Sequence, residues 1–254
     1  MNLKFNKSLA YQYKSNSQKA RVITESWVGN NIFCPFCGST LKHHENNKPV
    51  GDFYCPKCDE DFELKSKKGS IGRKIINGSY SAKIRRINGD KNPNFFVLAY
   101  DIVDFSVLNF FVIPNHFFVT KLIEKRKPLS KTARRAGWIG SNILLNLIPN
   151  SGKIFYIKNR EIKDKDVVLK QFKKTIFLRK QKGELKGWLL DVMACIDKLK
   201  KEEFTLQEVY AFEDELKAKH PKNKHVKDKI RQQLQFLRDK GYLKFLEKGV
   251  YKTT

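Results

Sequence analysis

Four of the five cysteines form two Cys-x-x-Cys pairs, a spacing that suits metal binding. Cys34 and Cys37 make the first pair, Cys55 and Cys58 make the second, and seventeen residues separate the pairs. Two intervening residues allow a tight turn to direct both sulfurs at one ion, and four thiolates complete a tetrahedron around Zn²⁺. Because four sulfurs leave no open position, we expect a structural Zn²⁺ and not a catalytic one.

The nearby histidines and the fifth cysteine are not expected to bind the metal. His43 and His44 lie between the pairs and are interpreted as surface loop residues, because the thiolates already complete the ligand count. Cys195 lies in an apolar helical stretch and is interpreted as a core residue. A redox role for the pairs is disfavoured, because one Cys-x-x-Cys would suffice for it.

An acidic cluster interrupts an otherwise basic sequence. Five acidic residues lie within twelve positions: Asp52, Asp59, Glu60, Asp61 and Glu63. The alternation around Asp52 and Glu63 is typical of strands, and it places Glu63 and Lys65 on one face, about 6.6 Å apart. If the two strands pair, Asp52 joins that face. Asp59, Glu60 and Asp61 are interpreted as a solvent-exposed turn.

Two carboxylates beside a lysine suit phosphodiester hydrolysis. The carboxylates would bind Mg²⁺, which lowers the pKa of a bound water and neutralises charge on the phosphate, while the lysine contacts the water or the phosphate. Together with Pro49 this is the PD-(D/E)xK nuclease pattern, and the second cysteine pair lies inside the hairpin that joins its acids.

The charge of the 254-residue chain indicates a polyanionic partner. Its formal net charge is +25, of which +21 belongs to residues 1–182. No apolar run approaches the roughly 18 residues of a membrane span, and no secretory signal is visible at the N-terminus. We therefore expect a cytoplasmic location with reduced thiols, no membrane association and no protein partner.

Residues 1–182 are predicted to form an α/β domain around one sheet. Strands predicted at 95–100, 107–113 and 153–157 would extend the sheet that begins at Asp52. A helix should start near Ser15, and its Glu25 is interpreted as a surface residue, with a supporting role beside the metal as the alternative. The basic segment 121–135 precedes Trp138, and we interpret Arg134, Arg135 and Trp138 as a DNA-facing loop.

Residues 183–254 are predicted to form a winged helix. Three helices, expected near 188–199, from 205 to about 216 and at 224–240, precede a terminal hairpin. A plain three-helix bundle is the alternative, and the hairpin counts against it. The third helix and wing carry the positive charge, and five residues near that helix are DNA-binding candidates: Asn223, Lys224, His225, Lys229 and Arg231.

Long segments across the chain carry a more specific signal. They are residues 13–21, 34–37, 45–55, 62–69, 92–96, 126–129, 132–140 and 229–235. These segments resemble the DpnI-like methylation-dependent type II restriction endonucleases. The resemblance implies a PD-(D/E)xK core with an embedded zinc site, a C-terminal winged helix, and cleavage of double-stranded DNA at GATC that carries N6-methyladenine.

The same resemblance implies a role for individual residues. Asp52 and Glu63 would bind the catalytic Mg²⁺, the Leu64 carbonyl would be a further ligand, Lys65 would be the catalytic lysine, and Trp138 would act at the DNA. A zinc-containing winged-helix regulator without catalysis and a repair nuclease are the alternatives, because zinc, positive charge and a winged helix do not require this cleavage reaction.

Overall fold

The computed structural model describes residues 1–45, 51–89 and 92–254, which form two compact units. The first unit contains Met1–Asn146 and Gly152–Lys173, and the second contains Leu147–Ser151 and Lys174–Thr254. The boundary between the two functional domains, which the sequence predicts after Lys182, remains a prediction. Among the described residues, no helix is both long and apolar enough to cross a membrane.

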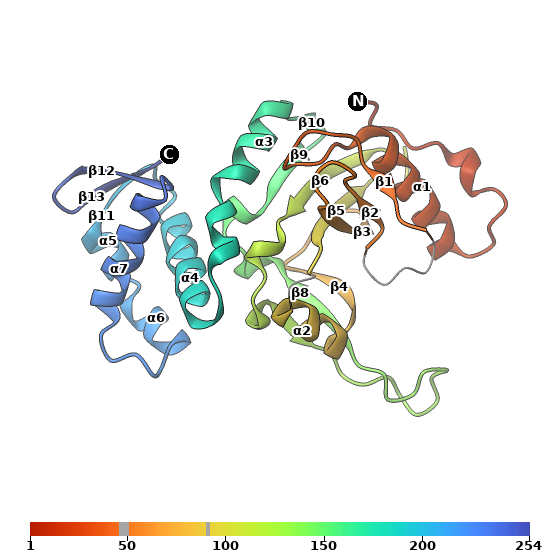
Figure 1. Cartoon of the computed structure of the whole chain (residues 1–254). Helices are drawn as coiled ribbons and strands as arrows, with labels where there is room; N and C mark the ends of the chain where they lie inside the picture. The colour runs from red at the N-terminus through yellow and green to blue at the C-terminus, as the bar shows by residue number, and fades with distance from the viewer. Residues whose placement is uncertain (46–50, 90–91) are drawn as a thin grey trace. The chain divides into compact units, whose positions relative to one another are not determined.

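A seven-stranded mixed sheet forms the centre of the first unit (Figure 1). Its strands, in spatial order, are β1 (Lys42–His43), β2 (Phe53–Tyr54), β3 (Asp61–Lys68), β5 (Asn94–Tyr100), β6 (Val107–Ile113), β9 (Ile154–Lys158) and β10 (Glu161–Ile162). β3 and β5 are parallel, whereas the other neighbours are antiparallel. The predicted extension of the Asp52 sheet by three later strands is therefore confirmed.

The central strand is apolar throughout because both of its faces are covered. Every residue of β5 is buried, as expected for a strand that lies inside a layered fold. On one face, helix α1 (Asn16–Asn31) packs Trp27 edge-on against Phe110, and Phe96 stacks on Phe62 with ring centroids 4.5 Å apart. This aromatic layer fixes α1 against the sheet beside β3.

A second, three-stranded sheet carries a long loop. Its strand order is β4 (Lys74–Ser79), β8 (Gly140–Leu144) and β7 (Ile123–Lys125), and helix α2 (Tyr80–Asn88) follows β4. Residues 126–139, which connect β7 to β8, extend away from this sheet as a long loop (Figure 1), and we call them the arm. Helix α3 (Lys165–Lys174) follows the last strand of the large sheet.

The second unit has the order of elements predicted for a winged helix, with two differences. It contains α4 (Gly183–Leu199), β11 (Glu203–Thr205), α5 (Leu206–Tyr210), α6 (Glu213–Lys219), α7 (Val226–Asp239), β12 (Leu243–Glu247) and β13 (Val250–Thr253). The predicted second helix is two short helices, because the chain breaks at 211–212. β11 was not predicted; it pairs with the wing strand β13.

Candidate active site

The hairpin of β2 and β3 brings Asp52 beside the later acid and lysine. Phe53 pairs with Phe62, and the Asp52 amide donates to the Phe62 carbonyl at 2.8 Å. The Asp52 Oδ2 atom then accepts a hydrogen bond from the Leu64 amide at 2.6 Å. Backbone pairing therefore holds the Asp52 carboxylate against the middle of the Glu63-Leu64-Lys65 segment.

Glu63 and Lys65 face each other, as strand periodicity predicts. Lys65 Nζ lies 2.5 Å from Glu63 Oε1, and Arg86 of α2 approaches Glu63 Oε2 at 3.7 Å. No sequence pattern relates Arg86 to this carboxylate, and only the fold brings the two together. The candidate site thus combines residues of β3 and α2 with the residue before β2.

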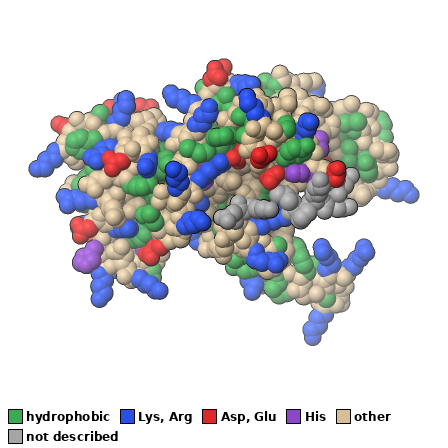
Figure 2. All heavy atoms as spheres, viewed as in Figure 1, with side chains coloured by type: hydrophobic (Ala, Val, Ile, Leu, Met, Phe, Trp, Pro, Cys, Tyr) green, Lys and Arg blue, Asp and Glu red, His purple; other side chains and the backbone are tan. Residues whose placement is uncertain are grey.

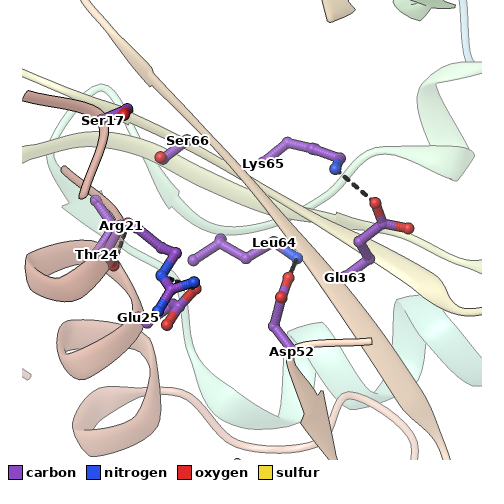
Figure 3. Close-up of a pocket in the computed structure, with 9 residues that line it drawn as sticks. All are labelled: Ser17, Arg21, Thr24, Glu25, Asp52, Glu63, Leu64, Lys65 and Ser66. Carbon is purple, nitrogen blue, oxygen red and sulfur yellow. Dashed lines mark hydrogen bonds and ion pairs between the residues drawn. The ribbon is translucent and has the colours of Figure 1, made fainter. Parts of the chain in front are cut away.

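A pocket of about 200 Å³ opens beside these residues and contains a third acid (Figure 3). Its lining includes Asp52, Glu63 and Lys65 on one side, and Arg21 and Glu25 of α1 on the other. Glu25 is 23% exposed and lies 3.6 Å from the Arg21 guanidinium. The preferred interpretation of Glu25 as a surface residue is therefore wrong, because α1 packs its acidic side chain into the pocket.

The surroundings of the carboxylates favour a cation. Burial raises the pKa of Asp52, and the charge of Glu63 raises it further, whereas the Leu64 amide and Lys65 lower it. Burial also raises the pKa of Glu25, with Asp52 adding to the effect. Partly buried carboxylates that repel one another gain most from a metal ion, and oxygen ligands of this kind suit Mg²⁺.

Each Cys-x-x-Cys pair forms a tight turn, here called a knuckle, and the four cysteines gather where the two knuckles meet. The Sγ atoms of Cys34, Cys37, Cys55 and Cys58 all lie within 4.8 Å of one another. A tetrahedron with Zn–S bonds near 2.3 Å has edges of about 3.8 Å, so the arrangement fits a tetrahedral metal. Burial raises the pKa of Cys34, and it raises the pKa of Cys58 to about 12. Four thiolates therefore need a cation to coexist here.

The two knuckles have matching backbone geometry. The Gly38 amide donates to the Cys34 carbonyl at 2.8 Å, and the Asp59 amide donates to the Cys55 carbonyl at 2.9 Å. Gly38 and Asp59 occupy the same place after the second cysteine of each pair, and both have a positive φ. Glycine and aspartate tolerate this conformation better than most residues, so the sequence encodes both turns.

Three polar residues around the knuckles differ from expectation. Glu60 is 7% exposed and accepts a hydrogen bond from the Asn94 side chain, so it is not part of a solvated turn. His44 contacts Asp61 at 2.8 Å with its side chain 16% exposed, and it is therefore not a surface histidine. Asp61 begins strand β3 and its side chain is 29% exposed, so it does not belong to a solvated turn either. His43 and Asp59 are exposed as predicted, but His43 belongs to strand β1 and not to a loop. Pro49 lies outside the described residues.

The arm presents the predicted DNA-contacting cations to solvent. Arg134 and Arg135 are exposed, and the Arg135 guanidinium lies 5.6 Å from the centre of the Trp138 ring. The indole is only half-buried and covers Gly140, where an added Cβ would come within 2.8 Å of it. The fold thus leaves Trp138 partly exposed at the base of the arm.

In the second unit, most of the predicted DNA-binding residues lie in or just before α7. Lys224 and His225 are exposed and precede α7, whereas Lys229 is on its first turns and bonds Gln232 at 2.7 Å. The Asn223 side-chain oxygen accepts from the His225 amide at 2.8 Å. Asn223 therefore already has a structural role in shaping the turn before α7. Arg231 is exposed on the helix.

Comparison with known protein families agrees with both units. The Dam-replacing family (DpnI) matches residues 1–181, and the Dam-replacing HTH domain (DpnI_C) matches residues 184–253. The two matches together cover nearly the whole chain, which confirms the resemblance inferred from sequence and the predicted fold class. The chain belongs to the Dam-replacing (DpnI) family, whose helix-turn-helix domain points to DNA as its partner.

Proposed function

We propose that this chain is a Mg²⁺-dependent restriction endonuclease that cuts double-stranded DNA at GATC containing N6-methyladenine. The observation that carries the proposal is the meeting of Asp52, Glu63 and Lys65 at one pocket, in a member of the Dam-replacing family. The acidic pocket lies in a basic unit, and Figure 2 shows acidic side chains grouped among lysines and arginines. Such a field attracts DNA and leaves a place for a metal.

Asp52 and Glu63 would hold the metal, with the Leu64 carbonyl as a third oxygen. In a β-strand the amide and carbonyl of one residue point to the same edge. Since the Leu64 amide points to Asp52, its carbonyl faces the same side. When bound, Mg²⁺ supplies a water of lowered pKa and offsets charge on the phosphodiester.

The side chains of the site have complementary tasks. Metal binding by Glu63 would release Lys65 from its 2.5 Å ion pair, so that the ammonium group can orient the attacking water or contact the phosphate. Glu25 faces the same pocket and is placed to accept a hydrogen bond from water there. The four cysteines would hold a structural Zn²⁺ that fixes the hairpin.

A plasmid digest tests this function. The purified protein with Mg²⁺ should cut adenine-methylated plasmid and leave unmethylated plasmid intact, and Lys65→Ala should lower the cutting rate by about a hundredfold or more. Lys68→Ala, an exposed change at the end of the same strand, should cut like the parent. Equal cutting of both plasmids would contradict the methylation dependence, and full activity of Lys65→Ala would contradict the site.

A further inference from the structure

Two residues on one wall of the pocket, Ser17 and Arg21, have no task in the proposed reaction. Helix α1 contributes Ser17, Arg21 and Glu25 to the lining, spaced four residues apart (Figure 3). Residues at this spacing lie on one helical face, so α1 presents a hydroxyl, a guanidinium and a carboxylate in a row. Catalysis by Asp52, Glu63 and Lys65 leaves the hydroxyl and the guanidinium unexplained.

Arg21 is held loosely enough to change partners. Its side chain is 60% exposed, and its ion pair with Glu25 is a 3.6 Å contact through Nε. The arginine precedes the glutamate along the helix, which is the less favourable order for a pair at this spacing. Exposed pairs of this kind contribute little to stability. Because the guanidinium has five donors in a planar fork, a phosphate oxygen is a better partner for it than one distant carboxylate oxygen.

The charge of the pocket leaves room for a phosphate once a divalent metal is bound. Three carboxylates, those of Glu25, Asp52 and Glu63, face Arg21 and Lys65 in the pocket lining, and Arg86 approaches Glu63 as a third cation. These charges balance without a metal, and a divalent metal adds an excess of two positive charges. That excess equals the charges of the scissile phosphate and one flanking phosphate. The charge balance therefore favours entry of the DNA backbone, and metal binding by the acids weakens the hold of Glu25 on Arg21.

The start of α1 adds hydrogen-bond donors to the same wall. Ser15 is the N-cap, but its side chain accepts no bond from the helix backbone. Its hydroxyl instead lies 2.8 Å from that of Ser17. The first amides of a helix lack partners within the helix and carry a partial positive charge. With Ser17 lining the pocket, the first turn of this sixteen-residue helix presents a hydroxyl to the site.

We propose that Ser17 and Arg21 form a phosphate-binding subsite for one of the two DNA phosphates that flank the scissile one. The subsite rests on the proposed nuclease function and extends it from the chemistry of the cut to the position of the strand. When the metal and DNA bind, the Arg21 side chain breaks its ion pair with Glu25 and binds the phosphate that flanks the scissile one. Its role is to position the strand over Asp52 and Lys65.

A binding experiment with single neutral phosphates tests the subsite. Methylated GATC duplexes carry a methylphosphonate at either flanking position, and binding is measured by fluorescence anisotropy in Ca²⁺ without Mg²⁺. One of the two substitutions should weaken the parent about tenfold and leave Arg21→Ala unchanged. On unmodified duplex, Arg21→Ala should lower the slope of log affinity against log salt by about one, and Arg21→Lys should recover the slope.

Lys19→Ala is the matched control, because Lys19 lies on α1 but does not line the pocket. It should bind every duplex with the parent's pattern, and circular dichroism should show that all variants are folded. Binding of Arg21→Ala that equals the parent's, or an equal loss by both proteins at both positions, would overturn the subsite. Failure of the parent to cut methylated plasmid in Mg²⁺ would instead contradict the nuclease function, so the two failures are distinguishable.

Discussion

At the scale of single residues, a lysine lies in an unusual place for a charged group. Lys83 of α2 is 3% exposed, and its Nζ lies 3.8 Å and 4.5 Å from the ring centres of Phe95 and Phe118. It donates to the Asn92 side chain at 2.7 Å. Burial lowers the pKa of Lys83 to about 7, although Glu63 raises it. The side chain fastens α2 to the sheet, and α2 in turn supplies Arg86 to Glu63.

This lysine makes stability depend on pH. Between about pH 7 and pH 10 the unfolded chain binds a proton that the folded chain has lost, so the free energy of unfolding rises with pH. Lys83→Met removes the cost of burying the charge. We expect its Tm to exceed that of the parent most at about pH 6, and the difference to shrink toward pH 10, corresponding to about 1.4 kcal/mol per pH unit. A Tm difference that is constant over this range would contradict the assignment.

At the scale of elements, sequence periodicity and spacing predicted most of the first unit. The alternation around Asp52 and Glu63, the apolar strands at 95–100 and 107–113, and the two cysteine pairs each carry a local signal. Short polar strands carry no such local signal in the sequence. β4 contains Asn77 and Gly78 and forms through pairing with β8, so tertiary contacts override its weak local preference.

The candidate site was predictable to the same extent. Asp52, Glu63 and Lys65 share one motif in and beside two paired strands, whereas Glu25 and Arg86 come from two helices distant in sequence. A helical glutamate or arginine is usually a solvated residue, and no spacing rule relates these helices to β3. Only the packing of α1 against the aromatic layer and of α2 through Lys83 brings them to the site.

The arm offers a test of how an element controls specificity. Gly140→Ala should displace the indole of Trp138 from its position over residue 140, because the new Cβ would lie 2.8 Å from the ring. Trp27 and Trp188 are 4% and 0% exposed, so a change in acrylamide quenching reports on Trp138. For Gly140→Ala we expect greater quenching and about a tenfold or larger loss of discrimination between methylated and unmethylated DNA. Trp138→Ala, which lacks the reporter indole, should lose discrimination to the same extent. Unchanged discrimination in both variants would exclude the arm from methyl recognition.

At the scale of the whole molecule, the positive charge is concentrated in two regions, as expected for two surfaces that contact DNA. Residues 1–182 carry +21, interrupted by the acids of the pocket, and residues 220–254 carry +7, while residues 183–219 carry −3. The helix-turn-helix unit therefore concentrates its positive charge on α7 and the wing. Nonspecific attraction by both units should bring DNA to the protein, and side chains in the pocket, the arm and α7 would then select the site.

Removal of zinc should abolish activity, because the two knuckles connect α1 to the β2–β3 hairpin of the candidate site. Cys34 follows α1, and Cys55 and Cys58 lie between β2 and β3, so one bound ion would join the helix to the hairpin that carries Asp52 and Glu63. Without it, four crowded thiols replace a closed tetrahedral centre.

We expect one zinc per chain, and we expect chelation to lower the Tm by about 10 °C or more and abolish cutting. Added Mg²⁺ should not restore activity, whereas added Zn²⁺ with Mg²⁺ should. Cys58→Ala should reproduce the chelated state, and Cys195→Ala, a buried cysteine of α4 outside the cluster, should keep the zinc and the activity. Full cutting by zinc-free protein would show that the hairpin holds Asp52 against Leu64 by backbone pairing alone, and the zinc would then have no part in shaping the site.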